Sequence, residues 1–172
     1  NHGSVRNPSL VPGLDYGVTC SVASSNYRMP EMAAAIGITQ IKRVDEFVTK
    51  RNLLADRYAE RLKDTDIVVP EIPNNQVMTW WQYIIALPEG TNLELRTNFC
   101  KTLLEEHTVP TANAYWPACH EQPAFLDYVK GYEYPVADDL LHRHVALPMY
   151  YEMDLDQVDY VCDSIIKILN DR

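Results

Sequence analysis

The longest regular pattern in this sequence is a helical repeat of apolar residues that runs from about residue 30 to residue 64. Its members recur at intervals of three, four or seven, which places them on one helix face: Ala34, Ile41, Val44, Val48, Ala55, Tyr58 and Leu62. Pro30 and Glu31 suit the first turn of a helix. An unbroken helix of this length would measure about 50 Å, more than the diameter of a small domain. We therefore expect a long N-terminal helix that bends, with Gly37 as the bend point, or that spans two structural units.

Strand patterns follow this helix. Residues 67–69 predict a short strand that Pro70 closes. Residues 79–87 carry aromatic and β-branched side chains on both faces and predict the main strand. Residues 109–114 predict a third strand.

Helix patterns separate these strands. Two helices open with pairs that have the spacing of a capping box, Thr91 with Glu94 and Asp154 with Gln157. Their expected inward faces are Leu95, Phe99 and Leu103 in the first helix, and Leu155, Val158, Val161, Ile165 and Leu169 in the second. Two short helices are expected at residues 122–129 and 136–144. This order predicts an α+β fold, with a small antiparallel sheet covered by helices.

Residues 1–25 differ from the rest of the chain. Asn7-Pro8 and Pro12-Gly13 are typical of turns and loops, and no apolar period is sustained. We interpret this segment as a connector without a core of its own.

Charge and cysteine spacing narrow the classes of function. The chain has 172 residues, with 24 acidic against 15 basic side chains and a net charge of −9, which disfavours binding to nucleic acid or to anionic membranes. No apolar window reaches the ~20 residues of a membrane helix, and no signal sequence opens the chain. The four cysteines form no C-x-x-C pair, which predicts reduced thiols rather than a zinc site. We expect a cytoplasmic protein without a metal.

Several residue pairs could carry chemistry, but each has a simpler interpretation. Cys119-His120 could form a thiol nucleophile with its base, yet adjacent side chains seldom point at each other. His142 and His144 are two apart and would face away from each other on a helix. The neighbouring carboxylates, Asp138-Asp139 and Glu105-Glu106, are typical of exposed helix faces. No glycine-rich phosphate loop is present.

Two clusters are better candidates for a binding site. Residues 25–28 combine the Asn26 amide and the Arg28 guanidinium at the start of a helix, where they could bind an anion or cap the helix. Residues 115–123 gather aromatic, imidazole and amide groups in a loop after a strand. That loop could bind a sugar or a nucleobase, or it could be a buried aromatic turn.

The same clusters resemble motifs of the DegT/DnrJ/StrS sugar aminotransferases. Residues 26–37, which read NYRMPEMAAAIG, are similar to the family's N-Y-R-M-x-E-x-x-A-A-I-G stretch. Shorter similarities follow the family's order along the chain: N-H-G at residues 1–3, W-Q-Y-I at 81–84, Y-W-P-A-C-H-E-Q-P-A-F at 115–125 and L-P-M at 147–149. Ser24-Ser25 and Trp116 depart from the family pattern.

The resemblance implies the small C-terminal domain of a fold-type-I enzyme that uses pyridoxal phosphate (PLP). It implies that Asn26 reaches the cofactor phosphate of the neighbouring subunit in a homodimer. It also implies that Arg28, Tyr115 and His120 line the site of a nucleotide-sugar substrate. Residues 1–28 would then be a remnant of the large domain that carries interface and active-site residues, and residues 29–172 would form the small domain.

The family's Schiff-base lysine has no counterpart here, because the family carries it before the N-H-G element. The six lysines of this chain fall on polar helix faces or in a turn. We therefore expect no catalytic residue in this chain and no PLP bound by the chain alone. The intact protein is expected to move an amino group, with glutamate as the donor, to a keto-sugar nucleotide. A non-catalytic interaction module that kept the small-domain fold is the alternative.

Overall fold

A computed structural model describes residues 4–7, 17–20, 29–112 and 117–171. The chain divides into two compact units, Asn1–Arg43 and Val44–Arg172.

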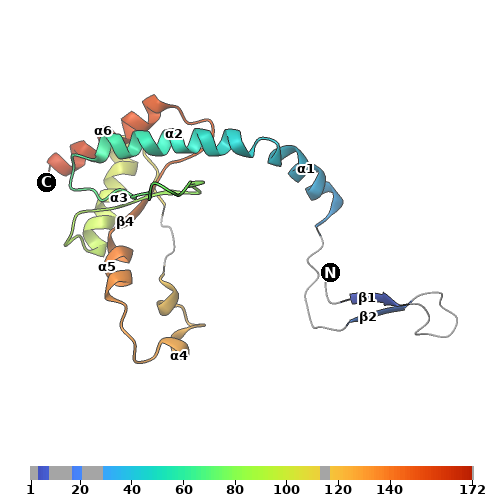
Figure 1. The fold of residues 1–172 in the computed structure, drawn as a ribbon. Helices are drawn as coiled ribbons and strands as arrows, with labels where there is room; N and C mark the ends of the chain where they lie inside the picture. Colours follow the sequence, from blue (N-terminus) through green and yellow to red (C-terminus); the bar gives the residue numbers. More distant parts are fainter. Residues whose placement is uncertain (1–3, 8–16, 21–28, 113–116, 172) are drawn as a thin grey trace. The chain divides into compact units, whose positions relative to one another are not determined.

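The first unit contains a β-hairpin and a helix. Strands β1 (Ser4–Asn7) and β2 (Gly17–Cys20) pair antiparallel, with Ser4 opposite Cys20 (Figure 1). The interpretation of residues 1–25 as a connector missed these two strands. Helix α1 (Glu31–Ile41) follows, and none of its residues is buried.

The long apolar repeat forms two helices rather than one. Helix α1 ends at Ile41, and α2 (Val44–Leu62) begins after a turn at residues 42–43, in which the Arg43 N–H bonds to the Gln40 carbonyl at 2.9 Å. The expected interruption is present, but its position at Gly37 was wrong. Gly37 lies inside α1, and a Cβ there would meet nothing within 4 Å, so no close packing requires glycine.

The second unit is built around a short antiparallel sheet. Strand β3 (Tyr83–Ala86) pairs with β4 (His144–Leu147), with Tyr83 opposite Leu147. The predicted strands at 67–69 and 109–114 reduce, within the described residues, to single bridges: Val68 pairs with Ala86, and Ala112 pairs with Ala146. The α+β class and the small antiparallel sheet are confirmed.

Strand β3 is shorter than the predicted strand 79–87 because side chains of α2 bind the segment before it. Arg51 Nη1 donates to the Trp80 carbonyl at 2.6 Å, and Asn52 Nδ2 donates to the Met78 carbonyl at 2.9 Å. The Trp80 indole N–H in turn donates a hydrogen bond to Asn52 Oδ1 at 3.0 Å. Trp80 has a φ of 48°, which is incompatible with an extended strand.

The remaining elements are α3 (Leu93–His107), the 3₁₀ turn η1 (Cys119–Glu121), α4 (Leu126–Val129), α5 (Pro135–Arg143) and α6 (Leu155–Asn170). Asp154 and Gln157 form the predicted capping box of α6, with bonds of 2.8 and 3.0 Å. The predicted cap of α3 at Thr91 was wrong by one residue: Asn92 Oδ1 accepts the Leu95 N–H at 2.9 Å. Asparagine caps helices at least as well as threonine.

The core of this unit lies between α2, α3, α6 and the sheet. Its fully buried members include Leu54, Tyr58, Leu62, Tyr83, Ile85, Leu103, Val145, Val158 and Ile165. The rings of Tyr58 and Tyr83 stack at 4.9 Å, and the Tyr58 hydroxyl donates to the Pro148 carbonyl at 2.9 Å. Helices α2 and α6 lie side by side (Figure 1) and are joined by ion pairs. In the described part of the chain, no helix has the length and apolar character needed to cross a membrane.

Candidate functional site

Of the four sequence-predicted site residues, one lies within the described residues. Asn26, Arg28 and Tyr115 fall outside them. His120 is the second residue of η1, and its side chain is 19% exposed.

The turn that carries His120 is fixed by its own hydrogen bonds. The Ala118 N–H donates to Glu121 Oε2 at 3.0 Å, and the Glu121 N–H donates to the Ala118 carbonyl at 3.0 Å. Gln122 Nε2 donates to the Pro117 carbonyl at 3.3 Å. The short polar stretch after Pro117 thus folds into a rigid support for the imidazole.

Helix α5 holds the imidazole from the other side. His120 Nε2 lies 2.8 Å from Asp138 Oδ1, and the ring stacks on Tyr134 with 4.8 Å between centroids. Tyr134 is the residue before Pro135, where α5 begins, and the Asp138 N–H bonds back to the Tyr134 carbonyl at 2.9 Å. Both contacts therefore come from the start of one helix.

His120 lies in the wall shared by two cavities. The first has a volume of about 530 Å³ and is bordered by β3, η1 and α5, with Ile84, Ala86 and Leu140 among its apolar lining. The second, of about 410 Å³, is lined by Phe125, Tyr128, Val129 and Tyr134 together with Cys119 and His120. Concave apolar sites with few polar groups are typical of small-molecule binding. His120 is a polar group that both cavities have in common.

His144 lies on the border of the first cavity. Burial, aided by the charge of Arg96, lowers the pKa of His144, although its Nδ1 contacts the Leu140 and Leu141 carbonyls at 3.2 and 3.0 Å. Arg96 Nε also donates to the His144 carbonyl at 2.6 Å. His144 is therefore neutral at pH 7 and anchored to the backbone.

The other sequence pairs do not form joint sites. The partner of His120 is Asp138 rather than Cys119, which is exposed. Asp139 binds Arg143 with oxygen–nitrogen distances of 2.5 to 3.0 Å, and this hydrogen bonding lowers the pKa of Asp139. The neighbouring carboxylates Asp138 and Asp139 thus serve different partners. Among the described residues, no group of three or more His, Cys, Asp or Glu could hold a metal ion.

PLP attaches to its enzymes through a Schiff base with a lysine side chain. All six lie within the described residues: Lys42, Lys50, Lys63, Lys101, Lys130 and Lys167. Lys50 is half-buried and the other five are exposed. A lysine that forms a Schiff base is activated by desolvation or by a neighbouring cation. Five of these lysines lack that desolvation, and Lys50 is not among the buried residues of α2, which are Leu54, Ala55, Tyr58 and Leu62. Within the described residues, none of the six lysines is buried.

Sequence reasoning missed two residues of this site. Asp138 was interpreted as an exposed helix charge, and Tyr134 was not singled out. Asp138 lies 18 positions from His120, and no local pattern connects them. The i, i+4 spacing of Tyr134 and Asp138 could have placed both on one face of α5, but it could not have shown what that face contacts.

Comparison with known proteins gives one consistent result. A model of the DegT/DnrJ/EryC1/StrS aminotransferase family matches residues 3–166. The chain is 28% identical to the GDP-perosamine synthase of Escherichia coli O157:H7 over 151 residues, which cover 88% of this chain and 39% of that enzyme.

Solved structures of aminotransferases are also similar to this chain. A DegT DnrJ EryC1 StrS aminotransferase from Brucella abortus is 26% identical with a TM-score of 0.70, covering 82% of this chain and 36% of that one. The PLP form of Spr1654 from Streptococcus pneumoniae is 18% identical with a TM-score of 0.79, covering 99% of this chain and 41% of that one, and it shows the shared fold. The chain thus spans about two-fifths of the length of these proteins. It belongs to the DegT/DnrJ/EryC1/StrS aminotransferase family.

Proposed function

We propose that this chain is the C-terminal part of a PLP-dependent aminotransferase that moves an amino group from glutamate to a keto-sugar nucleotide. The intact enzyme is a cytoplasmic homodimer in this proposal. The family match over residues 3–166 supports the reaction class. The GDP-perosamine synthase relative supports a nucleotide-linked sugar as the substrate class.

The observation that carries the proposal is the environment of His120. This residue belongs to the family-like loop at residues 115–125 and borders a cavity of about 530 Å³. An apolar cavity excludes water, and a fixed imidazole in its wall can hydrogen-bond a sugar hydroxyl. In the proposal, His120 and Tyr115 contact the substrate and Arg28 lines the same site.

The residues that hold the cofactor are divided, in the proposal, between this chain and a region outside residues 1–172. PLP acts as the electron sink of the reaction when it is bound. The lysines described above do not suit its attachment, so we assign the Schiff-base lysine to a large domain outside residues 1–172. Asn26 contacts the cofactor phosphate of the neighbouring subunit.

Reductive trapping tests this division of roles. The 172-residue chain and the intact protein are each mixed with PLP, reduced with borohydride and digested for mass mapping. We expect one stoichiometric lysine adduct in the intact protein, at a position outside this sequence, and only scattered substoichiometric labelling of the chain alone. A stoichiometric adduct on one of the six lysines of this chain would overturn the assignment. An intact protein with no specific adduct would favour the non-catalytic interaction module.

A further inference from the structure

The contacts on His120 suggest a role for α5 that the family assignment does not include. Tyr134 and Asp138 are four residues apart, so they share one face of the helix start. The phenol ring stacks on the imidazole at an interplanar angle of 26°, and the carboxylate oxygen lies 2.8 Å from Nε2. Stacking restricts the tilt of the ring, and the hydrogen bond fixes its rotation.

The Asp138 contact also determines where the imidazole carries its proton. A carboxylate can only accept a hydrogen bond, so Nε2 must be the donor. In the neutral ring Nδ1 is then the acceptor. Among the residues that the structure describes, Nδ1 of His120 has no hydrogen-bond partner, although the side chain is only 19% exposed. Nδ1 is therefore left as an acceptor on a residue that borders both cavities.

We propose that Asp138 is a positioning residue that holds His120 with Nδ1 ready to accept a hydrogen bond from a sugar hydroxyl of the nucleotide-sugar substrate. The ligand class rests on the proposed function, whereas the hold of Asp138 on His120 rests on the geometry. Asp138 acts through His120 and does not itself touch the substrate. Its loss should weaken substrate binding more than it slows the chemical step.

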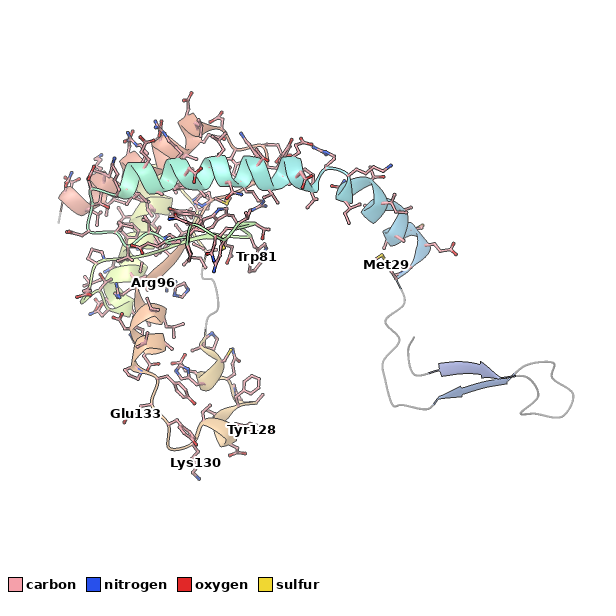
Figure 2. All side chains as sticks on the ribbon, in the orientation of Figure 1. Met29, Trp81, Arg96, Tyr128, Lys130 and Glu133 are labelled. Carbon is pink, nitrogen blue, oxygen red and sulfur yellow. The ribbon has the colours of Figure 1, made fainter. Side chains whose placement is uncertain are left out.

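The first test observes the His120 ring in the 172-residue chain by NMR at pH 8. An imidazole N–H exposed to water exchanges too fast to give a signal, whereas a hydrogen-bonded one is protected. We expect a His120 Hε2 resonance in the wild-type chain that is lost in Asp138→Ala and retained in Asp138→Asn, whose amide oxygen can still accept. Glu133→Gln is the matched control, because it removes the same charge from an exposed residue that precedes α5 (Figure 2).

The second test measures amino transfer by the intact enzyme. One lost hydrogen bond corresponds to roughly a tenfold rise in KM for the keto-sugar nucleotide. We expect that rise in Asp138→Ala with kcat little changed, recovery in Asp138→Asn and no change in Glu133→Gln. Backbone NMR spectra confirm that each variant is folded.

The outcomes separate the inference from the proposed function. An Hε2 resonance that persists in Asp138→Ala would overturn the positioning role, as would an unchanged KM in an active enzyme. An intact wild-type protein that transfers no amino group would overturn the proposed function, and with it the ligand assigned to His120.

Discussion

Two thiols of this protein lie in opposite environments. Cys119 is exposed in η1 beside His120, whereas Cys162 is fully buried in α6 against the core. Burial raises the pKa of the Cys162 thiol to about 12. Since the thiolate is the reactive form, Cys162 is unreactive both because it is covered and because it stays protonated.

Alkylation kinetics test this contrast. With iodoacetamide at pH 8, we expect Cys119 to be modified in the native chain within minutes, and Cys162 to be modified only at the rate of unfolding. Peptide mass mapping over time measures both, and Cys119→Ser removes the fast site as a control. Equal modification rates in the native chain would contradict the buried position of Cys162.

The sequence singled out His120 as a candidate site residue, but it did not indicate the two side chains that contact the imidazole. The motif around His120 is continuous in the chain, so it can be recognised by eye. Asp138 and Tyr134 reach the ring only because α5 packs against η1, and that packing is a tertiary event. Asp138 therefore looked like an ordinary surface charge.

Among the helices, α2 and α6 are joined by charge as well as by apolar packing. Arg57 donates to both carboxylate oxygens of Asp159 at 2.7 Å, and both side chains are about one-third exposed. Arg61 contacts Asp159 at 3.5 Å and pairs with Asp163. The hydrogen bonds from Arg57 lower the pKa of Asp159.

The lowered pKa of Asp159 gives stability a specific pH dependence. A carboxylate whose pKa is lower in the folded state stabilises the fold above its ordinary pKa of about 4, and this contribution is lost as the pH falls through the folded value. Asp159→Asn should therefore lower the urea midpoint at pH 7, and its difference from the wild type should shrink towards pH 3. Glu106→Gln, an exposed change on α3, is the control. A difference that does not depend on pH would contradict the ion pair.

The sequence predicted the helices better than their boundaries. The capping pair of α6 is local chemistry, and its position was correct. The turn at residues 42–43 contains neither Gly nor Pro, so nothing in the sequence marked the end of α1. The sequence analysis did not predict strand β4. The alternation of polar and apolar residues in α5 continues into His144, and residues 144–147 become extended only because they pair with β3.

At the scale of the whole molecule, this chain spans about two-fifths of the length of its relatives. In the function proposed above, the active site combines residues of this chain with a lysine from outside residues 1–172. Sequence comparison could identify the family because its motifs are spread along the chain. It could not predict the two cavities around His120, of which one is bordered by η1, β3 and α5 and the other by η1 and α4.

Mixed dimers test the proposed role of Asn26. Loss of one hydrogen bond to the charged phosphate should weaken PLP retention about ten- to a hundredfold in Asn26→Ala. When such subunits are mixed with subunits that lack the Schiff-base lysine, each hybrid dimer has one site with both defects and one with neither. Up to half of the wild-type activity should then return. If hybrids form and no activity returns, Asn26 serves the site of its own subunit.

The central claim is that the intact protein transfers an amino group to a nucleotide-linked sugar, and isotope transfer measures this directly. The intact protein is incubated with PLP, ¹⁵N-glutamate and either a GDP-linked or a dTDP-linked keto-sugar, and the products are weighed by mass spectrometry. A variant without the Schiff-base lysine is the control. We expect a ¹⁵N-labelled amino sugar nucleotide and one equivalent of 2-oxoglutarate for each amino group moved. A folded, PLP-loaded protein that leaves all of the ¹⁵N in glutamate with both sugars would contradict it.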